Sequence, residues 1–225
     1  MKSTPWSSPI IPPTVRRSQF TTYVLEQLRY QVLSGQRKHG ERLVEQELAA
    51  EFNVSRGPVR DALFVLEQEG LVLSLSRGGT EVVGLSSSDI VDFYAVRYQL
   101  ENMACETLLT RPVRDLQSLQ SITNLMAEAA DDSSQVSILD VQFHHQLVRL
   151  ASNHFLLRLW ETLGPVVAGM LKLTNSLWVT SDIIDGHTKI VQALDNGDTA
   201  VSQILKGHLD FAKTLMEQYV SQAEH

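Results

Sequence analysis

The chain is poor in the features that mark disulfide-linked or membrane-spanning proteins. Only one of its 225 residues, Cys105, is a cysteine, which excludes an intramolecular disulfide and a zinc site built from several cysteines. The first 19 residues hold four of the seven prolines and no continuous apolar core, unlike a signal peptide or a spanning helix. We therefore expect a flexible N-terminal arm over residues 1–19, no membrane partner and a reducing cytoplasmic location.

The chain also lacks the excess of positive charge that is typical of nucleic-acid-binding proteins, because its formal net charge is −7. The acidity is uneven: residues 1–84 carry a net charge of +1 and the remainder −8. A near-neutral first part can still bind DNA if its arginines cluster on one face. The length and the 43% hydrophobic content suit two domains, which we expect at 20–84 and 85–225.

Two short amphipathic helices are predicted within residues 45–70, separated by a turn of only a few residues. Their apolar positions recur at helical spacing, with Leu48, Ala49 and Phe52 in the first and Val59, Ala62, Leu63 and Leu66 in the second. Ser55 is placed to cap the second helix, and Pro58 falls in its first turn, where a missing N–H costs nothing. The second helix should therefore begin near Arg56, and the pattern predicts a helix-turn-helix.

Arg56 and Arg60 lie four residues apart in the opening turns of the second helix, beside the apolar stripe. Guanidinium groups at this place can reach phosphates or guanine edges when a helix enters the major groove N-terminus first. An exposed arginine pair is more often a solvated helix face, so the interpretation depends on the flanking segments.

The flanking segments predict a wing and a third helix. Leu71, Leu73 and Leu75 alternate in a short strand, Arg77-Gly78-Gly79 makes a tight turn, and residues 80–83 return as a second strand. Upstream, Phe20, Val24, Leu28 and Val32 recur every four residues, in a helix that should end near residues 34–35. These elements predict a winged helix-turn-helix with Arg77 at the wing tip.

The segment GERLVEQELAAEFNVSRGPVRDALFVLEQEGLV, followed by RGG, resembles the N-terminal domain of GntR-superfamily transcription regulators of the FadR-like branch, over residues 20–83. The resemblance implies a bacterial, dimeric, usually repressing protein that binds double-stranded operator DNA. It implies DNA contacts from the start of the recognition helix and from the wing, at Ser55, Arg56, Arg60, Arg77 and Gly78. One position departs, because Gln46 stands where some members use a basic residue for DNA; glutamine can still read a base.

From Ser86 onward the pattern is helical almost throughout, and no alternating strand pattern competes with it. Six or seven helices are expected. We expect helices to start after capping residues at Ser86–Asp89 and at Asn153 or His154, and at Pro112. We expect an interruption of the chain at 131–134, a kink or break at Gly164-Pro165, and a turn at 196–198 between the last two helices. The fold class is therefore mainly α, with the winged domain followed by an all-α antiparallel helical bundle.

Four residues of the predicted bundle are candidates for one metal site. Asp140 and His144 stand one turn apart on the same helix face, while His145 points about 100° away. His187 and His208 lie on or beside the inward stripes of the last two helices. A single inward histidine is more often a core residue with a hydrogen-bond partner, but four buried polar groups without partners would each cost a few kcal/mol. A shared ion removes that cost.

The resemblance extends to this part of the chain, since DVQFH, HTKIVQALDNGD and HL are similar to the ligand-bearing segments of the FCD effector domain. All four ligand positions match, as Asp140, His144, His187 and His208. Such a set suits one divalent ion per chain; Zn²⁺, Ni²⁺, Mn²⁺ and Fe²⁺ all fit, with Zn²⁺ or Ni²⁺ favoured. A small carboxylate or hydroxy acid could take the open coordination positions. The resemblance also implies that Arg97 faces the effector cavity; the alternative is that Arg97 only pairs with Glu101.

These observations predict a homodimeric repressor that an acidic effector, bound at the metal, releases from a palindromic operator. Pairing is expected through the C-terminal bundles. Two other function classes stay open. A direct metal sensor would respond to the ion itself, without an organic effector. A metal-dependent enzyme is disfavoured, because no glutamate flanks a ligand in a helical His-Glu pattern, and we expect no enzymatic activity.

Overall fold

The computed structural model describes residues 18–223, except 77, 114, 175–176 and 178. The described residues divide into two compact units, one formed by residues 18–87 together with 220–223 and the other by Ser88 to Tyr219. Most of the expected N-terminal arm, residues 1–17, lies outside the described range. Its last residue, Gln19, already belongs to the first helix, because Ser18 caps that helix through a hydrogen bond from the Thr21 N–H.

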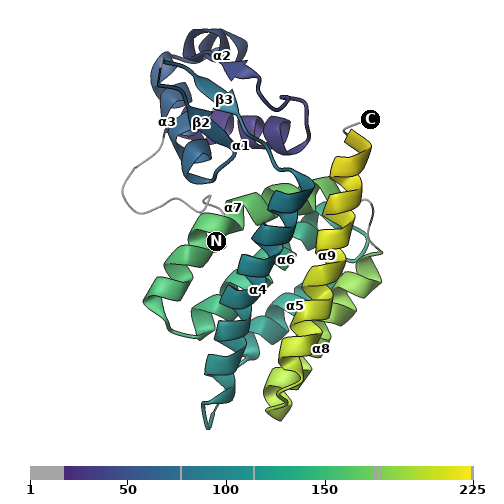
Figure 1. Ribbon diagram of the computed structural model, residues 1–225. Helices are drawn as coiled ribbons and strands as arrows, with labels where there is room; N and C mark the ends of the chain where they lie inside the picture. The colour runs from purple at the N-terminus through teal and green to yellow at the C-terminus, as the bar shows by residue number, and fades with distance from the viewer. Residues whose placement is uncertain (1–17, 77, 114, 175–176, 178, 224–225) are drawn as a thin grey trace. The chain divides into compact units, whose positions relative to one another are not determined.

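The first unit is a winged helix-turn-helix, as predicted (Figure 1). Its elements are α1 (Gln19–Leu33), β1 (Arg42–Leu43), α2 (Glu45–Glu51), α3 (Arg56–Gln68), β2 (Val72–Ser74) and β3 (Thr80–Val82). The three strands form an antiparallel sheet in the order β1-β3-β2. Helix α3 packs against α1, α2 and β2, so it forms the centre of the unit.

Buried apolar side chains and one ion pair hold α3 in place. Val59 and Leu66 of α3 are fully buried, as are Val24 and Leu28 of α1. The guanidinium of Arg29 on α1 donates two hydrogen bonds, of 2.8 and 2.6 Å, to the carboxylate of Glu69 at the end of α3. The predicted start of α3 at Arg56 is confirmed. Ser55 occupies the N-cap position, but its side chain makes no capping hydrogen bond.

The wing differs from the prediction in two respects. The alternation of Leu71, Leu73 and Leu75 predicted one strand face, but β2 begins only at Val72, which is buried while Leu73 is 53% exposed. Leu71 belongs to the turn after α3, where its N–H donates to the Leu66 carbonyl. The prediction also missed β1, which places Leu43 in the core.

Glycines shape the wing tip. Gly78 and Gly79 have φ values of 84° and 94°, which glycine adopts without a steric cost. The Arg42 guanidinium donates a 2.7 Å hydrogen bond to the Gly78 carbonyl. A Cβ on Gly79 would lie 2.9 Å from Arg42 Nε, so the glycine also makes room for this contact. The expected tip residue, Arg77, lies outside the described residues.

The second unit is a bundle of six helices in the part of the chain that the structure describes (Figure 1). They are α4 (Ser87–Leu109), α5 (Gln117–Glu128), α6 (Ser133–Leu150), α7 (His154–Thr174), α8 (Thr180–Asn196) and α9 (Val201–Ala223). Helix α6 packs against α5, α7 and α8, so its residues face the middle of the bundle. Within the described ranges, no helix is both long and apolar enough to cross a membrane.

Residues at the ends of several bundle helices lie largely where the sequence predicted helix boundaries. The Asp132 carboxylate accepts from the Gln135 N–H at the start of α6, and the Asn153 amide oxygen accepts from the Phe155 and Leu156 N–H groups at the start of α7. Gly197 adopts φ 68° after α8, which ends that helix.

The prediction for Pro112 is wrong, and of the kink or break expected at Gly164-Pro165 the break is absent. Pro112 does not open a helix, because α5 begins at Gln117, whose N–H donates to the Asp115 carboxylate. Gly164-Pro165 does not break α7, which continues to Thr174. A proline inside a helix costs about 3 kcal/mol. Burial of the apolar side chains beyond Pro165 outweighs this, at roughly 1.5–3 kcal/mol each; they include Val166, Val167, Met170 and Leu171.

Candidate metal centre and DNA-binding helix

The structure brings the four predicted metal-site residues together inside the bundle. Asp140 and His144 come from α6, His187 from α8 and His208 from α9, and their ligand atoms all lie within 4.8 Å of one another. His144 and His187 are fully buried, and Asp140 and His208 are 2% and 8% exposed. We call this group the Asp/His cluster. The expected i, i+4 alignment of Asp140 and His144 is present, since both side chains face the same point.

The spacing of the cluster suits one ion. His144 Nε2 lies 3.3 Å from His187 Nε2 and 3.3 Å from His208 Nε2. Asp140 Oδ1 lies 3.4 Å from His144 Nε2 and 3.7 Å from His187 Nε2. Metal bonds of about 2.0–2.2 Å place the ligands of a tetrahedral site roughly 3.3–3.5 Å apart. The observed distances are close to this spacing.

Hydrogen bonds on the far side of two imidazoles orient their free nitrogens toward the cluster. His187 Nδ1 lies 2.7 Å from the Ile183 carbonyl, which can only accept, so Nδ1 carries the hydrogen. His144 Nδ1 lies 2.5 Å from Glu101 Oε2 in the same kind of contact. In the neutral imidazoles, Nε2 therefore keeps its lone pair. Two nitrogen lone pairs that face one another repel, but both can bind a cation placed between them.

The pKa shifts of Asp140 and His208 suit metal ligands, whereas the pKa of His144 is raised, because its contact with Glu101 outweighs the lowering by burial. Burial alone would raise the pKa of Asp140, but His187 and His144 hold that pKa well below its usual range, so the side chain is a carboxylate. Burial, and then His187 and His144, lower the pKa of His208 well below its ordinary value, so its imidazole is neutral. Moreover, Asp140 Oδ1 is buried without a hydrogen-bond partner among the described residues. The residues present therefore fit a divalent ion.

Arg97 lies beside the cluster and is only 1% exposed. Its Nε donates a 2.8 Å hydrogen bond to Glu101 Oε1, so the pairing considered from the sequence is present. Its Cζ lies 5.6 and 5.7 Å from the ring centroids of Tyr94 and Trp160. Burial raises the pKa of Tyr94 to about 12, so this neighbour stays a neutral phenol.

Two buried donors beside the cluster have no partner within the described part of the chain, Arg97 Nη1 and Trp160 Nε1. Such donors in an apolar interior are costly unless an acceptor meets them. Sequence reasoning missed Trp160, whose only signal was its place on an apolar face of α7. It also treated Glu101 only as a partner of Arg97, although Glu101 contacts His144 as well.

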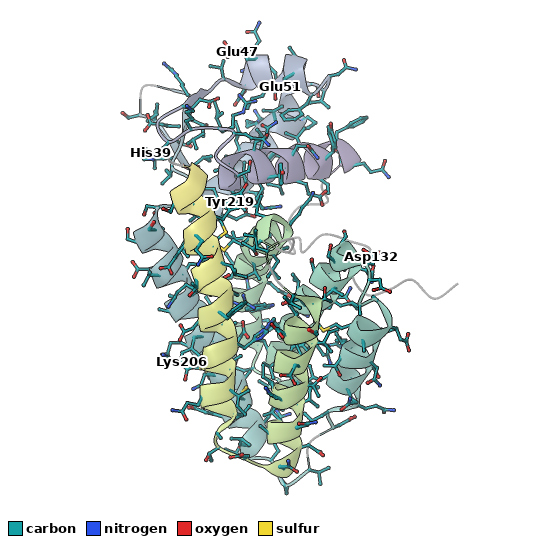
Figure 2. The ribbon with its side chains drawn as sticks, turned by 90° about the vertical axis from the view of Figure 1, so that its right-hand side faces the viewer. His39, Glu47, Glu51, Asp132, Lys206 and Tyr219 are labelled. Carbon is teal, nitrogen blue, oxygen red and sulfur yellow. The ribbon has the colours of Figure 1, made fainter. Side chains whose placement is uncertain are left out.

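A surface groove with a volume of about 360 Å³ lies between α8 and α9, and His208 of the cluster forms part of its wall. Gly186 allows the two helices to approach here, because a Cβ at this position would lie 2.6 Å from His208 Nδ1. Lys206, two residues before His208, points away from α8 and is exposed (Figure 2). The groove gives an ion or a small ligand a path to His208.

The predicted DNA-contacting residues are exposed where the structure describes them, on or next to the helix-turn-helix and at the wing. Arg56 and Arg60 lie in the first two turns of α3, with Ser55 before them, Gln46 on α2 and Gly78 at the wing. Arg56 pairs with Glu45 at 2.8 Å, but its side chain remains 67% exposed. Sequence reasoning overlooked Phe64, one turn after Arg60 on α3 and 60% exposed.

A winged helix-turn-helix joined to a helical bundle that contains an Asp/His cluster defines a DNA-binding transcription regulator. Comparison with known proteins agrees. Residues 20–82 match the family described as bacterial regulatory proteins, gntR family, and residues 92–211 match the FCD domain. The chain belongs to the GntR family, in the branch that carries an FCD domain.

Three relatives show how far the similarity extends. The gluconate operon transcriptional repressor of Bacillus subtilis (strain 168) is 32% identical over 187 residues, which cover 79% of this chain and 76% of the repressor. A solved GntR family member from Pseudomonas syringae pv. tomato str. DC3000 is 28% identical, with a TM-score of 0.53 and coverage of 91% and 87%. The structure of Lar, which controls expression of the Listeria monocytogenes agr system, has a TM-score of 0.68 at 17% identity and coverage of 91% and 99%, a likeness in fold alone.

Proposed function

We propose that this GntR-family regulator is a homodimeric repressor that carries one divalent metal ion per chain and leaves its operator when a small carboxylate binds in the bundle. The observation that carries the proposal is the Asp/His cluster, which lies beside two buried donors without partners. Relatives such as the gluconate operon transcriptional repressor support a repressing role, and the FCD match supports an effector-binding second domain. Operator DNA also makes the cytoplasm the expected location.

The DNA-binding surface in this proposal consists of the start of α3, its neighbour Gln46 on α2, and the wing. Ser55, Arg56 and Arg60 would enter the major groove, while Gly78 and Arg77 would meet the backbone or minor groove. Dimerisation is typical of the family, and two copies paired through their bundles would read the two halves of a palindrome. Exposed apolar side chains on α4, at Val91, Val96 and Met103, offer surface that a second copy could cover.

Asp140, His144, His187 and His208 would hold the ion. Three imidazoles and one carboxylate suit a borderline divalent ion, with Zn²⁺ or Ni²⁺ favoured over Mn²⁺ or Fe²⁺. When bound, the ion would supply positive charge and open coordination positions for oxygen ligands. A direct metal sensor would use the same four residues, and the groove beside His208 gives it equal support. No similar support exists for an enzyme, since the relatives are regulators and Glu101 contacts His144 at Nδ1.

Arg97 and Trp160 would bind the effector. Arg97 Nη1 and Trp160 Nε1 are donors without partners, which suit an acidic molecule with acceptor oxygens. Arg97 belongs to α4, which begins at Ser87, shortly after β3 ends at Val82. A shift of α4 can therefore reach the wing along a short stretch of chain.

The Arg97→Met variant tests whether an effector bound in the bundle releases the protein from DNA. A duplex selected by the purified protein from random DNA would be titrated with and without each member of a panel of small carboxylic and hydroxy acids. We expect the active acid to weaken DNA binding by the parent about 5- to 150-fold, a coupling of roughly 1–3 kcal/mol. Arg97→Met should bind metal and DNA but fail to release the DNA, because it lacks the guanidinium.

The outcomes separate the candidate functions. Equal release from the parent and from Arg97→Met would exclude Arg97 as a binding group for the effector. Release by a metal ion alone, with no response to any acid, would favour the direct metal sensor. A thermal-shift panel of metals and acids gives an independent check, since a molecule that binds the folded state stabilises it by mass action.

Two glycines next to metal-site residues provide a matched test of the cluster. Gly186→Ala should weaken Zn²⁺ binding about 10-fold or more, because the new Cβ would lie 2.6 Å from His208 Nδ1 and displace that imidazole. Gly207→Ala should leave Zn²⁺ binding unchanged, because nothing lies within 4 Å of its added Cβ. Both changes place alanine in a helix beside a cluster histidine, so equal Zn²⁺ affinities by calorimetry would contradict the assignment of His208.

A further inference from the structure

Glu101 divides its carboxylate between two donors in the interior of the bundle. Its Oε2 faces His144 Nδ1 at 2.5 Å and its Oε1 accepts from Arg97 Nε at 2.8 Å. Glu101 is fully buried, so water cannot replace either contact. We infer that Glu101 is a positioning residue for the metal, because it keeps the hydrogen of His144 on Nδ1 and so leaves Nε2 as the ligand. This inference rests on the proposed metal site.

A carboxylate suits this position because both neighbours are donors. In a carboxylate both oxygens accept, which matches the Arg97 Nε–H at Oε1 and the His144 Nδ1–H at Oε2. A glutamine has the same shape but only one acceptor, and its NH₂ group must face one of the two neighbours.

Arg97 determines which way that amide would turn in Glu101→Gln. A guanidinium is always protonated and has only donors, so an NH₂ group cannot pair with it. The amide oxygen would therefore face Arg97 and the NH₂ would face His144. His144 Nδ1 would then accept, its hydrogen would move to Nε2, and this hydrogen would point at the metal position. The variant would keep its shape but lose a metal ligand.

This reasoning predicts that a second change restores metal binding. In Arg97→Met/Glu101→Gln no guanidinium competes for the amide oxygen, which is free to accept from His144 Nδ1 again. A purely structural role for the Arg97–Glu101 pair predicts otherwise, because each substitution would then lower the stability of the metal-free protein and the double variant would not regain affinity for the metal.

The experiment uses the full chain, stripped of metal by a chelator and titrated with Zn²⁺ against a competing chelator of known affinity. Glu101→Gln should bind Zn²⁺ about 10- to 100-fold more weakly than the parent, the usual cost of losing a hydrogen bond to a metal-bound histidine. Arg97→Met/Glu101→Gln should recover most of that loss. Glu106→Gln is the matched control on the same helix, where the carboxylate is exposed and accepts from Asn102, and it should bind like the parent. Thermal melts of the metal-free proteins report folding separately.

Each result tests either the metal site itself or the positioning role of Glu101. A parent that binds no Zn²⁺ would refute the metal site itself. A parent that binds Zn²⁺ with unchanged affinity in Glu101→Gln would overturn the role of Glu101, as would a loss that the double variant does not repair. If Glu101→Gln fails to fold, Arg97→Met/Glu101→Gln is compared with Arg97→Met/Glu101→Leu. Leucine cannot accept a hydrogen bond, so the glutamine variant should bind Zn²⁺ about 10-fold more tightly, and equal affinities would overturn the inference.

Discussion

The His187→Ala variant is expected to lose its metal and to melt at a lower temperature than the parent. The substitution removes one of three imidazoles that face the same point, and the affinity of a site for metal depends on its full set of ligands. A ligand present at about 1,000 times its Kd stabilises the folded state by roughly 4 kcal/mol. For a chain of this size, that corresponds to a fall of about 10 °C in Tm.

The measurement is the metal content per chain, together with thermal melts before and after treatment with a chelator. The parent should lose stability on chelation, whereas His187→Ala should not, because it has no ion to lose. Asp140→Asn is a companion variant that keeps the shape of the side chain and removes only its charge, so it covers the case in which His187→Ala folds poorly. His208→Ala should behave like His187→Ala.

His145→Ala is the matched control for this prediction. His145 follows His144 directly on α6, is only half-buried and does not belong to the Asp/His cluster. Its replacement should therefore leave the metal content unchanged. Loss of metal from His145→Ala equal to that from His187→Ala would show that the helical phase of α6 is assigned wrongly.

The helix-turn-helix could be predicted because its signals are local. The position of Ser55, the place of Pro58 and the apolar spacing of Val59 and Leu66 all lie within a few residues of the element they define. These signals predict the start of α3 at Arg56 correctly, although Ser55 makes no side-chain capping hydrogen bond. By contrast, β1 has two residues, too few for any alternation, and it exists because β3 pairs with it.

Long-range packing accounts for the wrong predictions. The sequence around Pro165 carries a strong local breaker, but the buried residues that follow it keep α7 continuous. Leu73 is as apolar as Leu71, yet Leu73 lies on the exposed face of β2, whereas Leu71 is buried in the turn after α3. Local propensity is a weak guide wherever tertiary contacts compete with it.

The four cluster residues could be proposed from the sequence because helical periodicity shows which side chains turn inward. The residues that contact the cluster could not be proposed in this way. Glu101 lies 43 residues from His144, and its hydrogen bond depends on how α4 packs against α6. The same holds for Trp160 on α7, whose N–H faces the interior without a partner among the described residues. Periodicity indicates a face, but only the packed bundle shows what that face meets.

Arg56→Ala and Arg60→Ala are each expected to weaken specific operator binding by about 1–3 kcal/mol, roughly 5- to 150-fold in Kd, for each base that the arginine no longer reads. Both side chains are exposed in the first turns of α3, so their removal should leave the core of the winged domain intact. The ion pair of Arg56 with Glu45 is exposed and contributes less than about 1 kcal/mol to stability. The fold and the metal content should therefore match the parent.

The measurement is a titration of the selected operator duplex, alongside an unrelated duplex that reports non-specific binding. Arg158→Ala is a suitable control, because Arg158 is an exposed arginine of α7 in the other unit and its removal changes the net charge equally. A decrease in affinity confined to the operator would indicate hydrogen bonds to bases, because a charge effect would weaken both duplexes together. If Arg56→Ala and Arg60→Ala both bound the operator as tightly as Arg158→Ala, α3 could not be the element that reads it.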